Sequence, residues 1–228
     1  MVLQVREGQT KAVSGARYEQ ALGAMVFATN HFSVFAIASK TADDFRFVDV
    51  PKVHWARAVI ETMVQKGLLA GRSADHFAPE EAVTRAEMMV LLARLNGAAL
   101  PEVGKAPFAD VQPEDWYAPA IAWAAERGLV HGVDAENFAP NAPISRQDLA
   151  VMLHNYLKDQ DYALPTASAV KTFGDEAAIA AYAQESVGVL QQAGMLSGKD
   201  GGCFGPQETT TRAEAAAVLA RLSAFKVE

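Results

Sequence analysis

Apolar residues recur at helical spacing in three separate parts of the chain. Most are three or four positions apart, which places them along one face of an amphipathic helix. The positions are Ala56, Val59, Ile60 and Met63 in the first part, Ile121, Ala124 and Ala125 in the second, and Ile179, Tyr182, Val187 and Leu190 in the third. A glycine that suits a left-handed C-cap follows each run, at Gly67, Gly128 and Gly194. The pattern predicts a helix over about 54–66 and two counterparts.

A second apolar run follows each of these glycines, after a loop that contains Gly, Pro and Asp. Its spacing is again that of an amphipathic helix. The runs are Met88, Leu91, Leu92 and Leu95, then Leu149, Met152, Leu153 and Tyr156, then Ala215, Val218, Leu219 and Leu222. The chain is therefore predicted to be mainly α, with three helix-loop-helix units.

A fixed order of short motifs marks every unit. Phe-x-Asp begins at Phe47, Phe108 and Phe173, which are offset by 61 and then 65 residues. A Gly-x-x-x-Gly segment, Phe-x-Pro and a Ser/Thr-Arg-x-acid segment follow in the same order. Recurrence at this period marks an array of units that are individually too small to bury their apolar faces. We expect the units to pack on one another.

The second helices begin with a capping-box pattern that contains an arginine. A hydroxyl at the N-cap and an acid three residues later occur at 84–87, 145–148 and 211–214. The arginine occupies the first helical position, where the positive end of the helix dipole disfavours a cation by up to about 1 kcal/mol. These arginines are Arg85, Arg146 and Arg212. An anion is therefore expected beside each of them.

The anion beside each arginine has two possible origins. One lies within the chain, namely Asp49, Asp110 or Asp175, each of which has the same place in its repeat. The other is a ligand, because a helix N-terminus presents free amides to an anion and a guanidinium binds a carboxylate with two hydrogen bonds.

The motif order Phe-x-Asp, early aromatic, Gly-Leu-x-x-Gly, Phe-x-Pro and Thr-Arg-Ala-Glu resembles the S-layer homology family over about residues 45–225. The resemblance implies three tandem modules in a pseudo-threefold bundle, a three-pronged spindle whose second helices form the centre. It also implies that grooves between modules bind secondary cell-wall polysaccharides, often through a pyruvylated sugar. The corresponding boundaries are 42–100, 101–164 and 165–228.

The resemblance and the repeat register together indicate candidate ligand-binding residues. Arg85, Arg146 and Arg212 are expected to bind an acidic group, with Asp49 and Asp110 beside them. Trp55 and Trp116 either stack on a sugar ring or cover the core. Gly71, Arg72, Gly132 and Lys199 are placed at the groove entrances. Because the third copy has Ala181 and Tyr182 where an indole is expected, the working grooves are predicted around Arg85 and Arg146.

Residues 1–41 have a different pattern and are interpreted as an N-terminal β extension, the end of an upstream domain. Aromatic and branched residues fill 25–29 and 32–38 on either side of Asn30 and His31, which predicts a β-hairpin-like ribbon. A lone ribbon is marginally stable. It is therefore expected to pack on the helical body or to pair with another copy of the chain.

Composition excludes several classes of function. The chain has 20 Lys and Arg against 27 Asp and Glu, a net charge of −7, so no basic surface favours nucleic acid. No apolar run approaches the roughly 20 residues of a membrane helix, and no signal-peptide pattern begins the sequence. Cys203 is the single cysteine, and the five histidines lack metal-ligand spacing. We expect no metal, cofactor, membrane insertion or catalytic site.

The leading hypothesis is a noncatalytic anchor that binds an anionic cell-wall polysaccharide at the cell surface, through the pyruvylated sugar that the resemblance implies. One alternative is a protein-interaction or surface-layer assembly module, since helical arrays serve this purpose widely. Another is the accessory tail of an extracellular enzyme whose catalytic domain lies upstream.

Overall fold

The computed structural model describes residues 2–6, 9–12, 17–19, 24–26, 34–37, 45–162, 164, 172–199 and 201–225. The chain divides into two compact units, residues 1–46 and 47–228.

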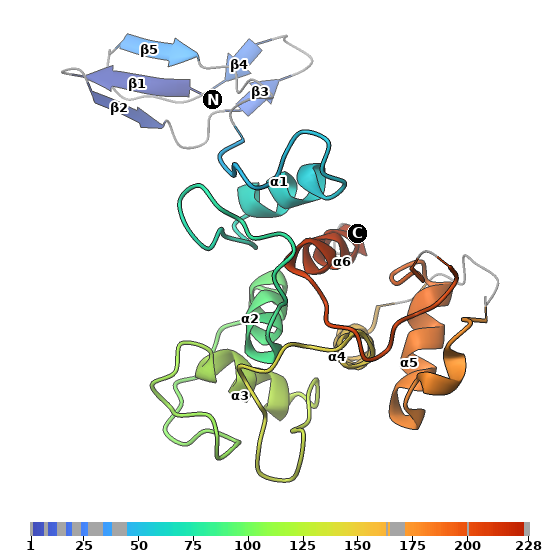
Figure 1. Cartoon of the computed structure of the whole chain (residues 1–228). Coiled ribbons are helices and arrows are strands. Elements are labelled where there is room, and N and C mark those ends of the chain that lie inside the picture. Colours follow the sequence, from blue (N-terminus) through green and yellow to red (C-terminus); the bar gives the residue numbers. More distant parts are fainter. Residues whose placement is uncertain are drawn as a thin grey trace. The chain divides into compact units, whose positions relative to one another are not determined.

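The described residues of the first unit form five short strands: β1 (Val2–Arg6), β2 (Gln9–Ala12), β3 (Arg17–Glu19), β4 (Ala24–Val26) and β5 (Val34–Ile37). β1 lies between β2 and β5, and β3 pairs with β4, all antiparallel (Figure 1).

The predicted hairpin needs correction. β4 overlaps the first predicted run and β5 lies within the second, but they pair with β3 and β1 and not with each other. The reason is that the first 19 residues supply additional strands, whose free backbone groups offer partners that a lone ribbon lacks. The predicted turn at Asn30 and His31, and any pairing with another copy, lie outside the described residues.

The second unit is mainly helical and contains three helix-loop-helix repeats, as predicted. They are α1 (Arg57–Gln65) with α2 (Arg85–Asn96), α3 (Ala118–Glu126) with α4 (Arg146–Asp159), and α5 (Ala181–Gln192) with α6 (Arg212–Phe225). A 3-10 turn, η1 (Glu176–Ala178), precedes α5. Among the described residues, no helix is both long enough and apolar enough to cross a membrane.

The predicted helix caps are largely confirmed. Gly67, Gly128 and Gly194 have φ near +70° after the first helices, the left-handed conformation that glycine adopts most easily. Thr84 and Glu87 exchange both capping-box hydrogen bonds, and 211–214 does the same. At 145–148 the structure gives one bond, from the Asp148 amide to the Ser145 hydroxyl. Asp148 is one methylene shorter than glutamate, and its carboxylate accepts from a tyrosine instead.

The three repeats contact one another in cyclic order. The second helix of each repeat packs on the first helix of the next, as α2 on α3, α4 on α5, and α6 on α1 (Figure 1). Just before the second helices, three backbone hydrogen bonds of 2.9–3.0 Å join the repeats. The Val83 amide donates to the Thr210 carbonyl, the Thr210 amide to the Ile144 carbonyl, and the Ile144 amide to the Val83 carbonyl. All three residues are buried. Each junction therefore needs residues from two repeats, and the third repeat closes on the first.

A pair of phenylalanines fixes the loop of each repeat. The ring centroids of Phe47 and Phe77 are 5.5 Å apart, and those of the two equivalent pairs, Phe108–Phe138 and Phe173–Phe204, are 5.3 Å apart. The second glycine of the Gly-x-x-x-Gly segment lies against this pair. A Cβ on Gly71 would be 2.4 Å from the Phe47 ring and 2.6 Å from two carbonyl oxygens. The loop backbone therefore passes too close to its neighbours for a side chain here.

Candidate functional site

The repeated aspartates hold the loop after each first helix. The Asp49 carboxylate accepts hydrogen bonds from the amides of Phe77 and Ala78, at 2.9 and 2.6 Å. Asp110 and Asp175 make the equivalent pairs of bonds. For Asp175 the amide of Phe204, and then that of Gly205, hold the pKa of the carboxyl below its usual range. Within the described residues, none of these aspartates forms an ion pair with the repeated arginines.

The three arginines clamp the loop of the next repeat. Each guanidinium donates through Nε to the carbonyl of the loop phenylalanine and through Nη2 to the carbonyl just before the second glycine. Arg85 donates to Phe138 and His131, Arg146 to Phe204 and Ser197, and Arg212 to Phe77 and Ala70, all at 2.7–3.0 Å. The guanidinium carbons lie 4.6–5.0 Å from the phenylalanine ring centroids. The arginines are 6%, 8% and 9% exposed.

This arrangement explains why a cation occupies the start of each second helix. Carbonyl oxygens and a ring face, both partially negative, surround the guanidinium and offset its unfavourable place on the helix dipole. The expected intramolecular anion is therefore a set of backbone carbonyls and not the repeated aspartates. Burial lowers the pKa of Arg85 and of Arg212 from the usual arginine value.

In Arg85 and Arg146 the remaining nitrogen, Nη1, faces the acid at the third position of the next second helix. Arg146 Nη1 lies 3.3 Å from the Glu214 carboxylate. Arg85 Nη1 lies 3.9 Å from that of Asp148. Arg85 and Arg146 thus join the loop and the second helix of the following repeat.

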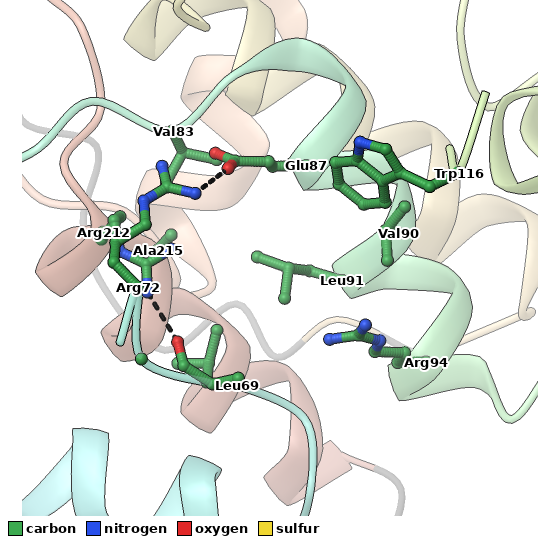
Figure 2. Close-up of a pocket in the computed structure, with 12 residues that line it drawn as sticks. Leu69, Arg72, Val83, Glu87, Val90, Leu91, Arg94, Trp116, Arg212 and Ala215 are labelled. Carbon is green, nitrogen blue, oxygen red and sulfur yellow. Dashed lines mark hydrogen bonds and ion pairs between the residues drawn. The ribbon is translucent and has the colours of Figure 1, made fainter. Parts of the chain in front are cut away.

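Two cavities lie beside these clamps, and each is built from three repeats. Groove 1 has a volume of about 140 Å³. Figure 2 shows Arg72 and Arg212 on one side of it, Trp116 and Arg94 on the other, and Leu91 between them. It is lined by Leu69, Ala70, Gly71, Arg72, Val83, Glu87, Val90, Leu91, Arg94, Trp116, Arg212 and Ala215.

Groove 2 has a volume of about 590 Å³, within the usual range of small-molecule sites. It is lined by Arg85, Leu129, Val130, His131, Gly132, Val133, Asp148, Val151, Met152, His154, Asn155, Lys158, Tyr182, Glu185 and Ser186. Both grooves therefore contain the arginine of the preceding repeat, the loop and second helix of one repeat, and an aromatic residue of the following one.

The aromatic residues of the two grooves are Trp116 and Tyr182, which are 64% and 61% exposed. The third copy lacks an indole, as the sequence indicates, but Tyr182 takes the corresponding place. It lies twelve residues before Gly194, as Trp116 lies twelve before Gly128 and Trp55 twelve before Gly67. Counting back from the glycine, and not forward from the aspartate, would have found it, because the extra residue precedes α5.

The groove entrances differ in charge. Arg72 forms ion pairs with Glu87 and, at 2.5 Å, with Glu81. The equivalent residue of groove 2 is Val133, which is 57% exposed. There the Tyr182 hydroxyl donates to Asp148 at 2.8 Å and accepts from Gln147. Burial, and then the bond to Asp148, raise the pKa of Tyr182 to about 12.

The other predicted site residues lie elsewhere or have structural contacts. Trp55 is 62% exposed at the start of the first repeat and lines neither groove. Lys199 forms an ion pair with Glu208. A Cβ on Gly132 would be 2.4 Å from two carbonyl oxygens, so this glycine is required by the backbone. In the part of the chain that the structure describes, no three His, Cys, Asp or Glu side chains form a metal-binding group.

Comparison with known proteins identifies the repeats. The model of the S-layer homology domain matches residues 46–89, 107–150 and 172–216. The chain belongs to the S-layer homology domain family. This family is typically a cell-wall anchoring module of S-layer proteins and surface enzymes.

In individual relatives, the matching region is a small part of a much longer protein. An amylopullulanase of Thermoanaerobacterium thermosulfurigenes is 32% identical over 206 residues, which is 90% of this chain and 11% of the enzyme. The S-layer protein sap of Bacillus anthracis is 32% identical over 189 residues, 83% of this chain and 22% of that protein. Exoglucanase XynX of Acetivibrio thermocellus is 31% identical over 169 residues, 74% of this chain and 15% of that enzyme. The chain thus spans less than a quarter of the length of these three relatives.

Proposed function

We propose that the S-layer homology repeats form a noncatalytic anchor that binds an anionic cell-wall polysaccharide in the grooves between repeats, at the cell surface. The observation that carries the proposal is the matched construction of grooves 1 and 2. Each combines an exposed aromatic ring, a buried guanidinium and loop backbone in one cavity.

These groups suit an acidic sugar. A flat aromatic ring can cover the apolar face of a sugar ring while its polar edge stays in water. A guanidinium that is already fixed by two carbonyls loses little conformational entropy when its remaining nitrogen binds a carboxylate. Several grooves on one body can bind successive parts of one polymer, which raises the overall affinity without new contacts.

The proposal includes the arrangement of the modules and their cargo. The cyclic order of the helix contacts supports a pseudo-threefold spindle with the second helices at its centre. The relatives include both S-layer proteins and enzymes, so the anchored part is proposed to be a surface-layer or enzymatic region outside this chain.

The test is co-sedimentation of the full chain with purified wall polysaccharide. The double variant Trp116→Ala and Tyr182→Ala removes the exposed ring from both grooves, and we expect at least a roughly tenfold loss of affinity from the lost stacking. Val53→Ala, at a side chain that is 92% exposed and lines neither groove, is the control. The clamp arginines are unsuitable for this test, because their removal also opens the repeat junctions.

Full binding by a folded double variant would contradict the proposal. Retention on walls that persists after the polysaccharide is removed would instead favour a protein partner. Circular dichroism at the co-sedimentation temperature checks that the variant is folded.

A further inference from the structure

The two grooves have the same architecture but a different balance of charge. Groove 1 is lined by three arginines, Arg72, Arg94 and Arg212, and one acid, Glu87. Glu81 adds a second acid through its ion pair with Arg72. One positive charge therefore remains in excess, and an excess of one sign of charge along a cleft attracts a ligand of the opposite sign.

Groove 2 is balanced. Its two cations each face an acid, with Arg85 at 3.9 Å from Asp148 and Lys158 at 3.3 Å from Glu185. The buried His154 also lines this groove, and burial lowers the pKa of its ring, which is therefore uncharged at pH 7. A ligand carboxylate that approached Arg85 would meet the Asp148 carboxylate as well, and like charges repel.

Arg72 causes the difference. In groove 1 it holds one carboxylate oxygen of Glu87, while the other oxygen accepts from the Thr84 amide. No ion pair joins Glu87 to Arg212 among the described contacts. In groove 2 the equivalent position is Val133, and Asp148 faces Arg85 directly. Arg72, the arginine after the second glycine, thus pairs with the Glu87 carboxylate, which would otherwise neutralise the guanidinium of Arg212.

We propose that the two grooves select sugars of different charge: groove 1 takes an acidic sugar, and groove 2 takes a neutral sugar of the same polymer. Arg72 is the residue that determines this specificity. The inference rests on the proposed function, because it assumes that both grooves bind wall polysaccharide.

The experiment uses a matched pair of probes, a methyl hexoside that carries a pyruvate ketal and the methyl ester of the same compound. The two have nearly the same shape and differ by one negative charge. Valine methyl signals of the full chain resolve the sites, because Val90 lines groove 1 while Val133 and Val151 line groove 2. Dissociation constants are measured separately from each set of signals.

We expect the Val90 signals to report at least roughly tenfold tighter binding of the acid than of the ester, since a charge-assisted bond is lost with the ester. The Val133 and Val151 signals should report similar affinities, within about threefold, for both probes. Arg72→Val, which copies groove 2, should abolish the preference in groove 1. Arg127→Gln removes a cation that pairs with Asp159 and lines neither groove, and it should leave the preference unchanged.

Equal affinities at Val90, or a stronger acid preference at Val133 and Val151, would overturn the assignment. Absence of any shift with either probe would overturn it too, and co-sedimentation with whole polysaccharide then decides separately whether the anchor proposal stands.

Discussion

Grooves 1 and 2 are made from equivalent segments, yet they differ fourfold in volume and in how their acids are paired. The clamp is the same in both, because Arg212 and Arg85 donate to equivalent carbonyls of the loop that follows. The entrance is different, with Arg72 bound to Glu87 in one and Val133 beside a Tyr182–Asp148 bond in the other. Residues that close the ring of repeats are thus repeated, whereas residues that meet a ligand are free to differ.

The largest expected effect tests whether the clamp arginines of the two grooves contribute equally to the stability of the fold. Arg85→Ala and Arg212→Ala each leave one buried and one partly buried carbonyl without a donor, and each should lower the free energy of unfolding by about 3 kcal/mol. Urea unfolding of the full chain, followed by the fluorescence of the buried Trp123, measures both.

A matched control for the clamp is Arg127→Ala, which breaks an ion pair with the partly exposed Asp159. Its cost should stay below about 1 kcal/mol, as for other surface pairs. If Arg85→Ala or Arg212→Ala also lowers the free energy of unfolding by less than about 1 kcal/mol, that arginine does not hold the repeats together.

A smaller effect tests the shared backbone of the two entrances. Gly71→Ala and Gly132→Ala each place a Cβ about 2.4 Å from existing atoms, and each should cost about 2 kcal/mol through overpacking. Gly104→Ala, which has no neighbour within 4 Å, should be close to neutral. If either entrance glycine accepts alanine as readily as Gly104 does, the loops are looser than described.

The smallest effect distinguishes the grooves by pH. His154 is buried against the Ser186 hydroxyl at 3.0 Å, and burial followed by nearby Lys158 lowers the pKa of its ring, while Glu185 opposes this. The unfolded chain, with a pKa of about 6.5, takes up the proton first as the pH falls. The stability that neutral His154 contributes at a pH above about 6.5 is therefore lost as the pH falls.

Hydrogen exchange at pH 7.5 and 5.5 measures this effect. Amides of α4 and α5 should lose protection relative to those of α2 and α3, because alanine occupies the equivalents of His154 in the other repeats, at Ala93 and Ala220. His154→Gln, which cannot titrate, should remove the difference. An equal loss of protection at both helix pairs would argue against a role for His154.

Much of the fold could be predicted from the sequence. The helices, their glycine C-caps and two complete capping boxes follow from patterns a few residues long. The β pairing in the first unit could not be predicted, because the partners of β4 and β5 are strands whose own sequences give a weak signal.

The candidate site was harder to predict. The acceptors of the Arg85 guanidinium lie 46 and 53 residues away along the chain, and those of Arg212 lie 135 and 142 away. The sequence indicates that an arginine at a helix start needs a negative partner, and it offers the repeated aspartates. These aspartates instead accept amides of the loop, so only their regular spacing was informative.

The sequence by itself determined the three helix pairs, where the first helices end and where the second helices begin, because these depend on local hydrogen bonds and apolar spacing. Only the tertiary structure decided which loop each arginine clamps, which acids face Arg85 and Arg146, and that Trp116 and Tyr182 each line a groove of the preceding repeat. The physical reason is that both grooves form where three repeats meet. Their chemistry therefore depends on how the ring of repeats closes, which no single repeat encodes.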